Sequence, residues 1–463
     1  MKEQPREKLA KHGQEHLLRF WDDLTESQQR HLAEQIDRID FVLIDQLHRE
    51  RDVLDDIRQV AEQADSPPSF RMGTGGRGMS PEQAKDLARE ALAHGHLGVI
   101  LVAGGQGTRL GFQPPKGLFP IGPISEKSLF QLHIEKILAA ARRYDVRIPL
   151  YLMTSPATHD DTVAFLAEHD RFGLPEQDLH VFCQGTMPAV DAASGKVLLD
   201  GPDQIALSPD GHGGMLAALK GSGGLDDIQA RGIRHLFYFQ IDNPLVDIAG
   251  LEFTGYHLAS GSEMSTQVVR KQDPLERVGN VVQVNGHLQV LEYSDLPDDI
   301  ARQRQADGSL KIWAGSIAVH AFDAAFLARM TVEAGALPFH IARKKVPYVD
   351  SDGQRIEPRE PNAVKFERFI FDLLPSAQRA IVVEIEPSEG FAPLKNAPGA
   401  ERDTPDWVRK QMMAQARRWL RAAGAEVADD VPVEISPLYA LDAEELAEKV
   451  GPGVKVTEAT YFE

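Results

Sequence analysis

A short, continuous apolar run that ends in a cluster of glycines constrains this chain most. The run LGVILVA covers residues 97–103 and leads directly into GGQGTRLGFQPPKG. Such a run, without polar alternation, is typical of a strand buried on both faces of a parallel sheet. Similar runs begin at Ile148, His235 and Ala380, and an amphipathic helical pattern begins at Ser128. Strands that alternate with helices predict an α/β fold.

The segments around this predicted sheet indicate further elements. The first sixty or so residues have a helical pattern, with Leu17, Leu18, Trp21 and Leu24 at helical spacing. TESQ (25–28) and SPEQ (80–83) match the capping box that begins a helix. Alternating polar and apolar residues at 264–270 and 280–293 predict added antiparallel strands. We expect three consecutive parts, namely an N-terminal helical region (1–95), a catalytic domain (96–388) and a small C-terminal α+β domain (389–463).

Charge and cysteine content exclude several classes of protein. The 463 residues carry a formal net charge of −19, which disfavours unspecific binding to nucleic acids and anionic membranes. Cys183 is the one cysteine, so no disulfide can form within the chain. No apolar run approaches the length of a membrane span. We expect a cytoplasmic protein, monomeric or weakly homo-oligomeric, with neither a nucleic-acid nor a membrane partner.

The glycine cluster predicts an anion site. Glycines let an anion approach the backbone closely, and the amides of a turn after a strand can converge on phosphate. The sequence lacks the Gly-Lys-Ser/Thr ending of a P-loop, and Gly111 comes one residue too late for the dinucleotide fingerprint. Arg109 offers a donor fork suited to phosphate, and Lys116 follows a rigid proline pair. By itself, the glycine pattern is equally compatible with an ordinary tight turn.

The motif LVAGGQGTRLGFQPPKG resembles the signature of the eukaryotic-type UDP-sugar pyrophosphorylases, and most of all their UDP-N-acetylglucosamine branch. FCQGTMPAV, LSPDGHGGMLAAL, YFQIDNPLVD, RVGNVV, VLEYSDLP, NAVKFERFIFDLL and FAPLKNAPG follow in the family's order, so the resemblance covers nearly the whole chain. It implies a Rossmann-like mixed sheet flanked by helices, in the nucleotidyltransferase, GT-A-like arrangement.

The resemblance also implies an activity. The family transfers a uridylyl group from UTP to a sugar 1-phosphate by direct in-line attack on the α-phosphate and releases pyrophosphate. We expect UDP-N-acetylglucosamine as the product. Three alternatives stay open: a UDP-glucose or broad UDP-sugar pyrophosphorylase, a catalytically inactive regulator that binds nucleotide sugars, and a glycosyltransferase. The last lacks a good Asp-x-Asp metal motif near Asp242.

Carried over residue by residue, the resemblance assigns the nucleotide and phosphate contacts. Arg109, Lys116 and Lys395 would offset phosphate charge during catalysis, and Asp242 would bind Mg²⁺. Taken alone, Asp242 reads more simply as a helix cap; Asn243 and Asp247 are weaker metal candidates. The predicted nucleotide contacts are Gly104, Gly105, Gly107, Thr108, Gly211 and Gln184, the last of which would read the uracil edge.

The predicted sugar contacts include departures from the family pattern. They are His212, Gly279, Glu292, Tyr293, Ser316, Lys365, Phe369 and Phe371. Where the family has asparagines, this chain has His212, Ser316 and Val319, and these changes leave the choice of sugar open. From the residues alone, Phe369 and Phe371 are more simply core residues, and His212 could be a neutral structural histidine.

Overall fold

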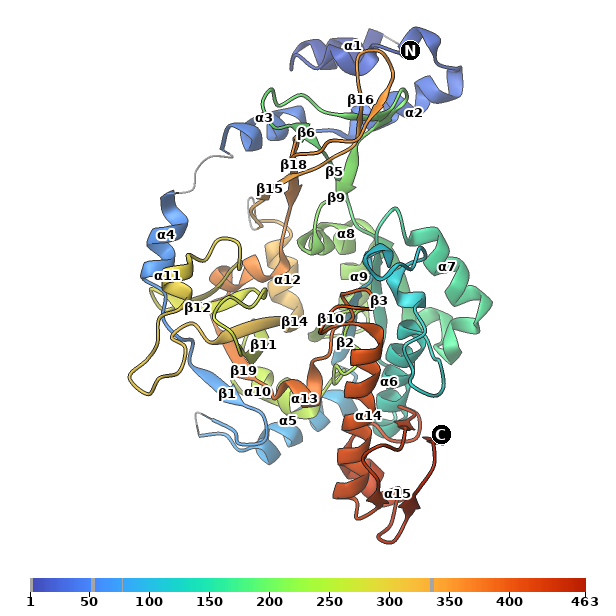
Figure 1. Cartoon of the computed structure of the whole chain (residues 1–463), viewed down its shortest axis with the longest axis vertical. Coiled ribbons are helices and arrows are strands. Elements are labelled where there is room, and N and C mark those ends of the chain that lie inside the picture. Colours follow the sequence, from blue (N-terminus) through green and yellow to red (C-terminus); the bar gives the residue numbers. More distant parts are fainter. Residues whose placement is uncertain (1–2, 51–54, 77, 334–336) are drawn as a thin grey trace. The chain divides into compact units, whose positions relative to one another are not determined.

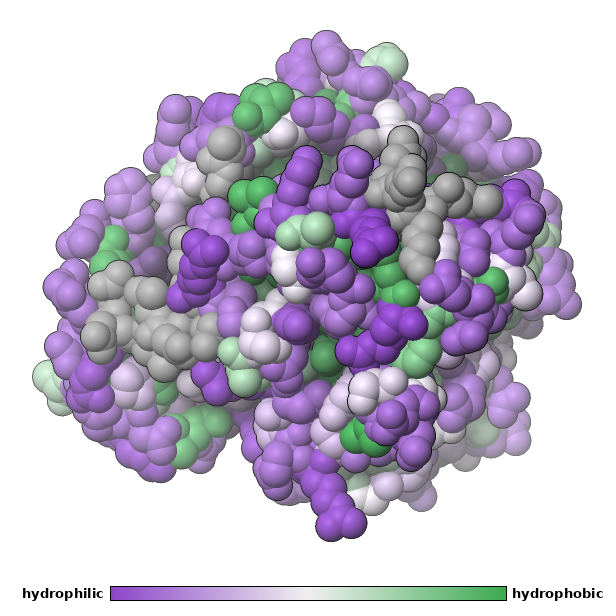
Figure 2. Space-filling model, turned by 90° about the horizontal axis from the view of Figure 1, so that it is seen from above, coloured by the Kyte–Doolittle hydropathy of each residue, from purple (hydrophilic) through white to green (hydrophobic). Residues whose placement is uncertain are grey.

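The computed structural model describes residues 3–50, 55–76, 78–333 and 337–463. The chain forms two compact units, each built from three separate segments. Unit 1 comprises residues 1–56, 184–217 and 337–372, and unit 2 comprises residues 57–183, 218–336 and 373–463. No described helix is long and apolar enough to cross a membrane. The face drawn in Figure 2 is mainly hydrophilic, with apolar residues in small separate patches.

A large mixed sheet is the framework of unit 2 (Figure 1). Its main path has eight strands, of which β14 alone runs antiparallel to its neighbours in the path. In spatial order they are β1 (Ser69–Arg71), β19 (Ala380–Glu384), β11 (Met264–Arg270), β14 (Ala314–Asp323), β10 (His235–Gln240), β2 (Leu97–Val102), β3 (Leu150–Thr154) and β4 (Leu179–Cys183). The hairpin of β12 (Asn280–Val284) and β13 (His287–Leu291) joins β14. This architecture confirms the predicted α/β fold with a mixed sheet flanked by helices.

Helices cover the sheet because their apolar faces complete its core. The main cluster of buried residues joins β2, β3 and β10 to α6 (Leu129–Tyr144) and α10 (Leu251–Ala259). Burial of every residue of β2 explains its unbroken apolar sequence. The other helices of unit 2 are α5 (Pro81–Ala93), α7 (His159–Glu168), α9 (Gly224–Ala230), α11 (Asp298–Ala301), α12 (Ala324–Met330), α13 (Pro387–Gly390), α14 (Pro405–Ala422) and α15 (Ala443–Lys449), while α8 (Met215–Gly221) and α4 (Asp55–Glu62) extend across a unit boundary.

Unit 1 combines helices with short strands around its own core. Its helices are α1 (Glu3–Ala10), α2 (Glu26–Arg38) and α3 (Phe41–Glu50). Its strands are β5 (Thr186–Pro188), β6 (Val190–Asp191), β7 (Leu199–Gly201), β8 (Gln204–Ile205), β9 (Leu207–Pro209), β15 (His340–Lys344), β16 (Tyr348–Val349), β17 (Arg355–Ile356) and β18 (Ala363–Glu367). Leu32, Ile36 and Phe41 pack with Val190 and Phe366 in one cluster, so three distant segments share a core.

The local predictions hold where the signal is local. Thr25 and Ser80 cap α2 and α5 with complete capping boxes, as predicted. The segment around Leu17 and Trp21 instead forms two short 3₁₀ turns, Glu15–Leu18 and Trp21–Asp23, after Gly13 has ended α1 with a φ of 65°. Residues 264–270 were expected to form an antiparallel addition, but β11 is a central strand, parallel to β19 and antiparallel to β14.

The predicted division at residues 95 and 388 differs from the two units. Residues 69–71 pair with β19, and helix α5 packs on α10, so both belong with the sheet. Residues 184–217 leave the sheet unit because β6 pairs with β18. The reason is that long-range strand pairing is invisible to a division based on local composition. Residues 416–456 within unit 2 have a small apolar cluster of their own.

The crossing of α10 and α5 gives a prediction about Gly255. A Cβ atom on Gly255 would lie 1.9 Å from the Ala84 carbonyl oxygen, so Gly255→Ala should destabilise by about 2 kcal/mol. Helix propensity alone predicts the opposite sign, about 1 kcal/mol of stabilisation. The control is Gly221→Ala in α8, where no atom lies within 4 Å and the free energy of unfolding should stay level or rise. Denaturant unfolding measures both; equal effects in the two variants would contradict this packing.

Candidate active site

The register between β2 and β10 places two predicted site segments at one edge of the sheet. Val102 pairs with Gln240, and the Ile241 amide donates to the Val102 carbonyl at 3.0 Å. The glycine turn therefore begins two residues beyond the end of β2, and Asp242 stands two residues beyond the end of β10. Carboxyl ends of parallel strands are where open α/β sheets present their ligand sites.

The glycine turn folds back on itself through the proline pair. The Gly107 amide donates to the Pro114 carbonyl at 3.2 Å, and the Lys116 amide donates to the Gly105 carbonyl at 3.1 Å. This pairing brings Lys116 beside the turn. A Cβ on Gly107 would lie 2.6 Å from the Phe112 carbonyl oxygen, so this position needs glycine. A short 3₁₀ turn, Thr108–Leu110, follows the glycines.

The turn presents unpaired amides to solvent. Among the described residues, the N–H groups of Gly104, Gly105 and Gln106 have no hydrogen-bond acceptor, while Ser155 Oγ holds the Gly104 carbonyl at 2.7 Å. Gly105 is exposed, and a Cβ there would meet no atom within 4 Å. Thr108 and Arg109 are also exposed. Consecutive free N–H groups beside cations form a concavity that favours an anion.

Two carboxylates and two lysines lie around this edge. Lys116 Nζ is 3.5 Å from Asp242 Oδ2, and both side chains are mostly buried. Burial raises the pKa of Asp403, and the nearby negative charge of Asp242 raises it further, while the ammonium of Lys395 lowers it. The group therefore holds charges of both signs in a partly desolvated place, where electrostatic interactions are strengthened.

Asn243 holds the segment that carries Lys395. Its Nδ2 donates to the Gly390 carbonyl at 2.8 Å, and its Oδ1 accepts from the Ala392 amide at 3.0 Å. The Leu394 amide then donates to the Asp242 carbonyl at 2.8 Å. These bonds fasten residues 390–394 along residues 242–243. Lys395 follows with an exposed side chain, so its position relative to Asp242 is set by the backbone on which it stands.

The Asp403 backbone closes the Lys395 loop from the other side. Its carbonyl accepts hydrogen bonds from the amides of both Lys395 and Asn396 at 2.9 Å. Asp403 has a φ of 62°, which is uncommon for a residue other than glycine. Asp403 was not among the predicted residues, and no local motif marks it. The contacts of Asn243 do not support a role as a metal ligand, because both polar atoms of its side chain form hydrogen bonds with backbone groups.

Three of the predicted sugar contacts, Gly279, Glu292 and Ser316, lie close together in unit 2. The Ser316 amide donates to the Gly279 carbonyl at 2.8 Å, and a Cβ on Gly279 would lie 3.4 Å from Glu292 Oε1. Three residues distant in sequence thus meet at one place. Tyr293 follows with a side chain that is 48% exposed. Near Ser316 the β14–β11 pairing shifts register and Ala318 has a φ of 56°, features of a β-bulge, which re-aims side chains. Val319, by contrast, is core.

In unit 1, the loop that carries Gly211 and His212 is fastened to the end of β18. The Arg368 amide donates to the Asp210 carbonyl at 2.8 Å, and the Gly213 amide donates to the Arg368 carbonyl at 2.8 Å. Gly211 has a φ of 84°, and a Cβ there would lie 2.3 Å from the Arg368 carbonyl oxygen. Gly211 is therefore required by backbone geometry, which is a reason for this glycine that the sequence does not show.

His212 lies in an aromatic group with a defined proton position. It stacks on Phe369 at 5.3 Å between ring centroids and meets the Phe371 ring edge-on at 5.6 Å. The Ile370 amide donates to His212 Nδ1 at 3.2 Å, so a neutral ring carries its proton on Nε2. Burial, and then the charge of His340, lowers the pKa of His212 to about 4. At neutral pH His212 is thus an uncharged donor.

The remaining predicted residues of unit 1 occupy separate positions. Phe369 is half-buried and its ring lies tilted against that of His340, with the centroids 4.4 Å apart, while Phe371 is 6% exposed. His340 Nε2 lies 2.7 Å from Asp372 Oδ2. Gln184 is buried and follows directly after β4, and Lys365 is half-buried on β18 opposite Ala342 of β15. Among the described residues, these contacts link His212 with both phenylalanines but give no hydrogen bond from the Gln184 or Lys365 side chain.

The structural similarity agrees with the sequence motif. A crystal structure of the uridine diphosphate N-acetylglucosamine pyrophosphorylase from Trypanosoma brucei, in complex with an inhibitor, matches with a TM-score of 0.80 and 26% identity. The match covers 96% of this chain and 93% of that chain. UDP-glucose phosphorylase from the same organism shares the fold at a TM-score of 0.58 and 18% identity, over 80% of this chain and 77% of that one.

Sequence comparison gives the family. The chain is 38% identical to UDP-N-acetylglucosamine pyrophosphorylase of Saccharomyces cerevisiae, over 83% of this chain and 82% of that protein. It is 37% identical to UDP-N-acetylhexosamine pyrophosphorylase-like protein 1 of Homo sapiens, over 92% and 86%. The family model described as UTP–glucose-1-phosphate uridylyltransferase matches residues 60–424. The chain therefore belongs to the UTP–glucose-1-phosphate uridylyltransferase family of nucleotidyltransferases.

Proposed function

We propose that this chain transfers the uridylyl group of UTP to N-acetylglucosamine 1-phosphate, with release of pyrophosphate. The observation that carries the proposal is the glycine turn, whose unpaired amides lie at the same sheet edge as the Lys116–Asp242 pair. This is the arrangement that a nucleoside triphosphate needs. The family supports the uridylyl transfer, and the relative from Saccharomyces cerevisiae supports the acetylated sugar.

The reaction requires that the two substrates are aligned and that the negative charge of their phosphates is neutralised. A phosphate oxygen of the sugar 1-phosphate attacks the α-phosphorus of UTP; the new O–P bond forms as the bond to the pyrophosphate oxygen breaks. The nucleophile is already anionic, so no general base is required. Arg109 and Lys116 would neutralise the triphosphate, and Lys395 would act as charge develops on the leaving group.

The residues present fit Mg²⁺. This ion takes one or two carboxylates and completes its shell with water and phosphate oxygens. Asp242 and Asp403 are two carboxylates close enough to influence one another, and the described residues contain no cluster of three or more metal-ligating side chains. We propose that Asp242 holds Mg²⁺, with Asp403 nearby; the bound ion would supply positive charge to the phosphates.

Sugar selection would involve the neutral His212 and its aromatic neighbours. Nε2–H of His212 can donate to a carbonyl or hydroxyl oxygen, and the faces of Phe369 and Phe371 suit a methyl group. These features favour an acetamido sugar. A UDP-glucose or broader UDP-sugar pyrophosphorylase is the second candidate, because His212 and Ser316 replace amide side chains of the family pattern. We further propose a cytoplasmic enzyme, monomeric or weakly homo-oligomeric, without nucleic-acid or membrane partners.

A substrate panel tests the function. Pyrophosphate release is measured with UTP, Mg²⁺ and either N-acetylglucosamine 1-phosphate or glucose 1-phosphate. We expect kcat/KM at least about tenfold higher for the acetylated sugar, since one well-placed apolar and polar contact is worth about that factor. EDTA should abolish release, and added Mg²⁺ should restore it. The reverse sugar preference would favour the second candidate, and no release with either sugar would contradict catalysis.

Gly105→Ala tests whether phosphate rests on the turn. The substitution meets no atom of the fold, so the free energy of unfolding should stay within about 0.5 kcal/mol. A methyl group on this exposed surface would obstruct phosphate and raise the KM for UTP by about tenfold or more. Calorimetry for UTP binding and denaturant unfolding give the two readouts. Unchanged UTP affinity in a stable Gly105→Ala variant would remove the turn from the nucleotide site.

Lys395→Ala tests the proposed charge neutralisation. The side chain is exposed and its backbone is fixed by neighbouring bonds, so folding should be preserved. We expect kcat to fall by about 100-fold, with little change in UTP affinity, because the cation acts mainly as charge develops. Lys410→Ala on α14 is the matched control, as another exposed lysine. An unaltered turnover number in the Lys395 variant would exclude this role.

A further inference from the structure

A cavity of about 380 Å³ lies within unit 2, apart from the residues assigned above to phosphate. It is bounded by α6, by residues 244–248, by the end of β19 and by α14. Its lining is largely apolar and includes Met72, Leu132, Ile385, Met412, Trp419 and Leu441. A concave, apolar site of this size, with few polar groups, is the kind that binds small organic molecules.

The polar lining groups are nearly all satisfied by the protein. Glu434 accepts hydrogen bonds from the Ile124 and Ser125 amides at 2.7 Å. Asp442 pairs with Arg143 at 2.6 Å; Glu386 and Glu389 likewise pair with arginines. Lys136 donates to the carbonyls of Pro244 and Val246 at 2.6 and 2.8 Å. These groups therefore have little left to offer a ligand.

Asp247 is the exception. Its carboxylate is accessible within the cavity and makes no hydrogen bond or ion pair among the described residues. Burial in this concave place raises the pKa of Asp247 to about 6, and the negative charge of Asp442 contributes. Lys136 and Arg143 lower the pKa, but both are engaged elsewhere. An unpaired carboxylate on the wall of a largely apolar cavity leaves a negative charge that a ligand cation can pair with.

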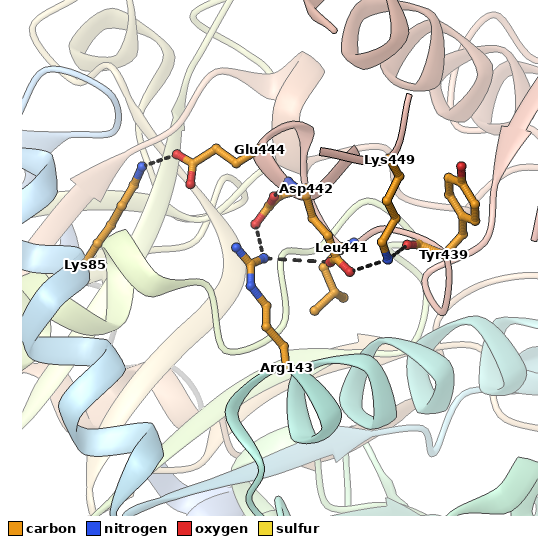
Figure 3. Close-up of polar contacts among 8 residues, drawn as sticks. Lys85, Arg143, Tyr439, Leu441, Asp442, Glu444 and Lys449 are labelled. Carbon is orange, nitrogen blue, oxygen red and sulfur yellow. Dashed lines mark hydrogen bonds and ion pairs between the residues drawn. The ribbon is translucent and has the colours of Figure 1, made fainter. Parts of the chain in front are cut away.

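The wall formed by the C-terminal residues is fixed by ion pairs, so the cavity is a defined feature of unit 2. Figure 3 shows Arg143 of α6 pointing to Asp442, and Lys85 of α5 pointing to Glu444. Lys449 Nζ donates a hydrogen bond to the carbonyl of Tyr439, which precedes Leu441 in the same segment. Leu441 and Asp442, which line the cavity, are held between these contacts.

We propose that this cavity binds a small organic cation with an apolar body, whose protonated amine pairs with Asp247. An anionic ligand would meet five lining carboxylates, and a neutral one would leave Asp247 unpaired. A protonated amine supplies both a positive charge and hydrogen-bond donors to a carboxylate. The aromatic side chain of Trp419 adds a surface on which a flat body can pack.

The cavity adjoins the two segments that carry predicted catalytic residues. Residues 244–248 continue from Asp242, and α14 begins two residues after Asp403, whose carbonyl holds the Lys395 amide. A ligand in the cavity would pack against both α14 and residues 244–248, and so against the segments whose hydrogen bonds place Lys395. Binding should therefore lower kcat; this link to turnover, unlike the binding site itself, rests on the proposed function.

Three probes with one ring system and different charges test the site on the full chain: tryptamine (cation), 3-methylindole (neutral) and indole-3-acetate (anion). Calorimetric titration at pH 7.5 should give at least tenfold tighter binding of tryptamine than of 3-methylindole, and the weakest binding for the acetate. Asp247→Asn should abolish the preference for tryptamine, whereas Asp352→Asn, at an exposed turn of unit 1, should retain it. Equal affinities for the three probes, no binding of any probe, or undiminished tryptamine affinity in Asp247→Asn would overturn the proposal.

The pH dependence gives a second readout. Protonation of Asp247 removes the charge that attracts the amine, so tryptamine affinity should fall as pH drops through about 6. The charged groups that face Asp247 are Lys136, Arg143, Asp442 and Glu252. Because the pKa of Asp247 is raised in the folded state, its charge lowers stability above this range. Asp247→Asn should therefore stabilise the protein more at pH 7 than at pH 4, as measured by thermal unfolding. An equal effect at both pH values would contradict an unpaired carboxylate.

The link to turnover is measured separately. Saturating tryptamine should lower kcat for pyrophosphate release at least twofold in the natural chain and leave Asp247→Asn unaffected. Binding without any change in kcat would overturn the link to Lys395 while the binding site stands. Should the chain release no pyrophosphate with any sugar 1-phosphate, the proposed function would fail, and the calorimetric comparison of the probes would still decide the site.

Discussion

The parallel pairing of β2 with β10 is the interaction on which the candidate site depends. Both strands are almost wholly buried, so their register is set by the core on both faces of the sheet. Because Val102 lies opposite Gln240, the chain leaves the sheet at the same level in both strands. A glycine turn with free amides and an aspartate then emerge side by side. A shift by one residue would turn Asp242 toward the opposite face and separate the two segments.

A second level of order comes from side chains that bind backbone. Asn243 bridges to Gly390 and Ala392, and the Asp403 carbonyl closes the loop that follows. Lys395 itself needs few contacts, because the chain on both sides of it is tied down. An exposed cation on a fixed backbone can reach a phosphate and still be released from it, which suits a group that acts on a leaving pyrophosphate. The cavity beneath α14 lies along the same two segments.

The aromatic group of unit 1 follows a different physical rule. The proposed phosphate contacts rely on charge and free amides, whereas His212 is kept neutral by burial and receives a backbone hydrogen bond on Nδ1. Its environment therefore selects one tautomer and one donor direction. The replacement of an amide by this imidazole keeps a single donor but changes its reach. In unit 2, the predicted sugar contact Ser316 lies near a register shift of β14, where Ala318 has a positive φ.

Local chemistry and contiguous patterns let the sequence determine the buried strands, the capping boxes of α2 and α5, the glycine turn and the family. These signals need only neighbours along the chain. The tertiary structure alone decided that β11 is central and that residues 184–217 share a core with residues 1–50 and 337–372. It also decided that the Asn243 side chain binds the backbone at Gly390 and that Asp403 lies close enough to Asp242 to feel its charge. It placed Asp247 in the lining of an apolar cavity. The reason is that strand order, register and desolvation depend on residues far apart in sequence, whose pairing is set only when the whole core packs.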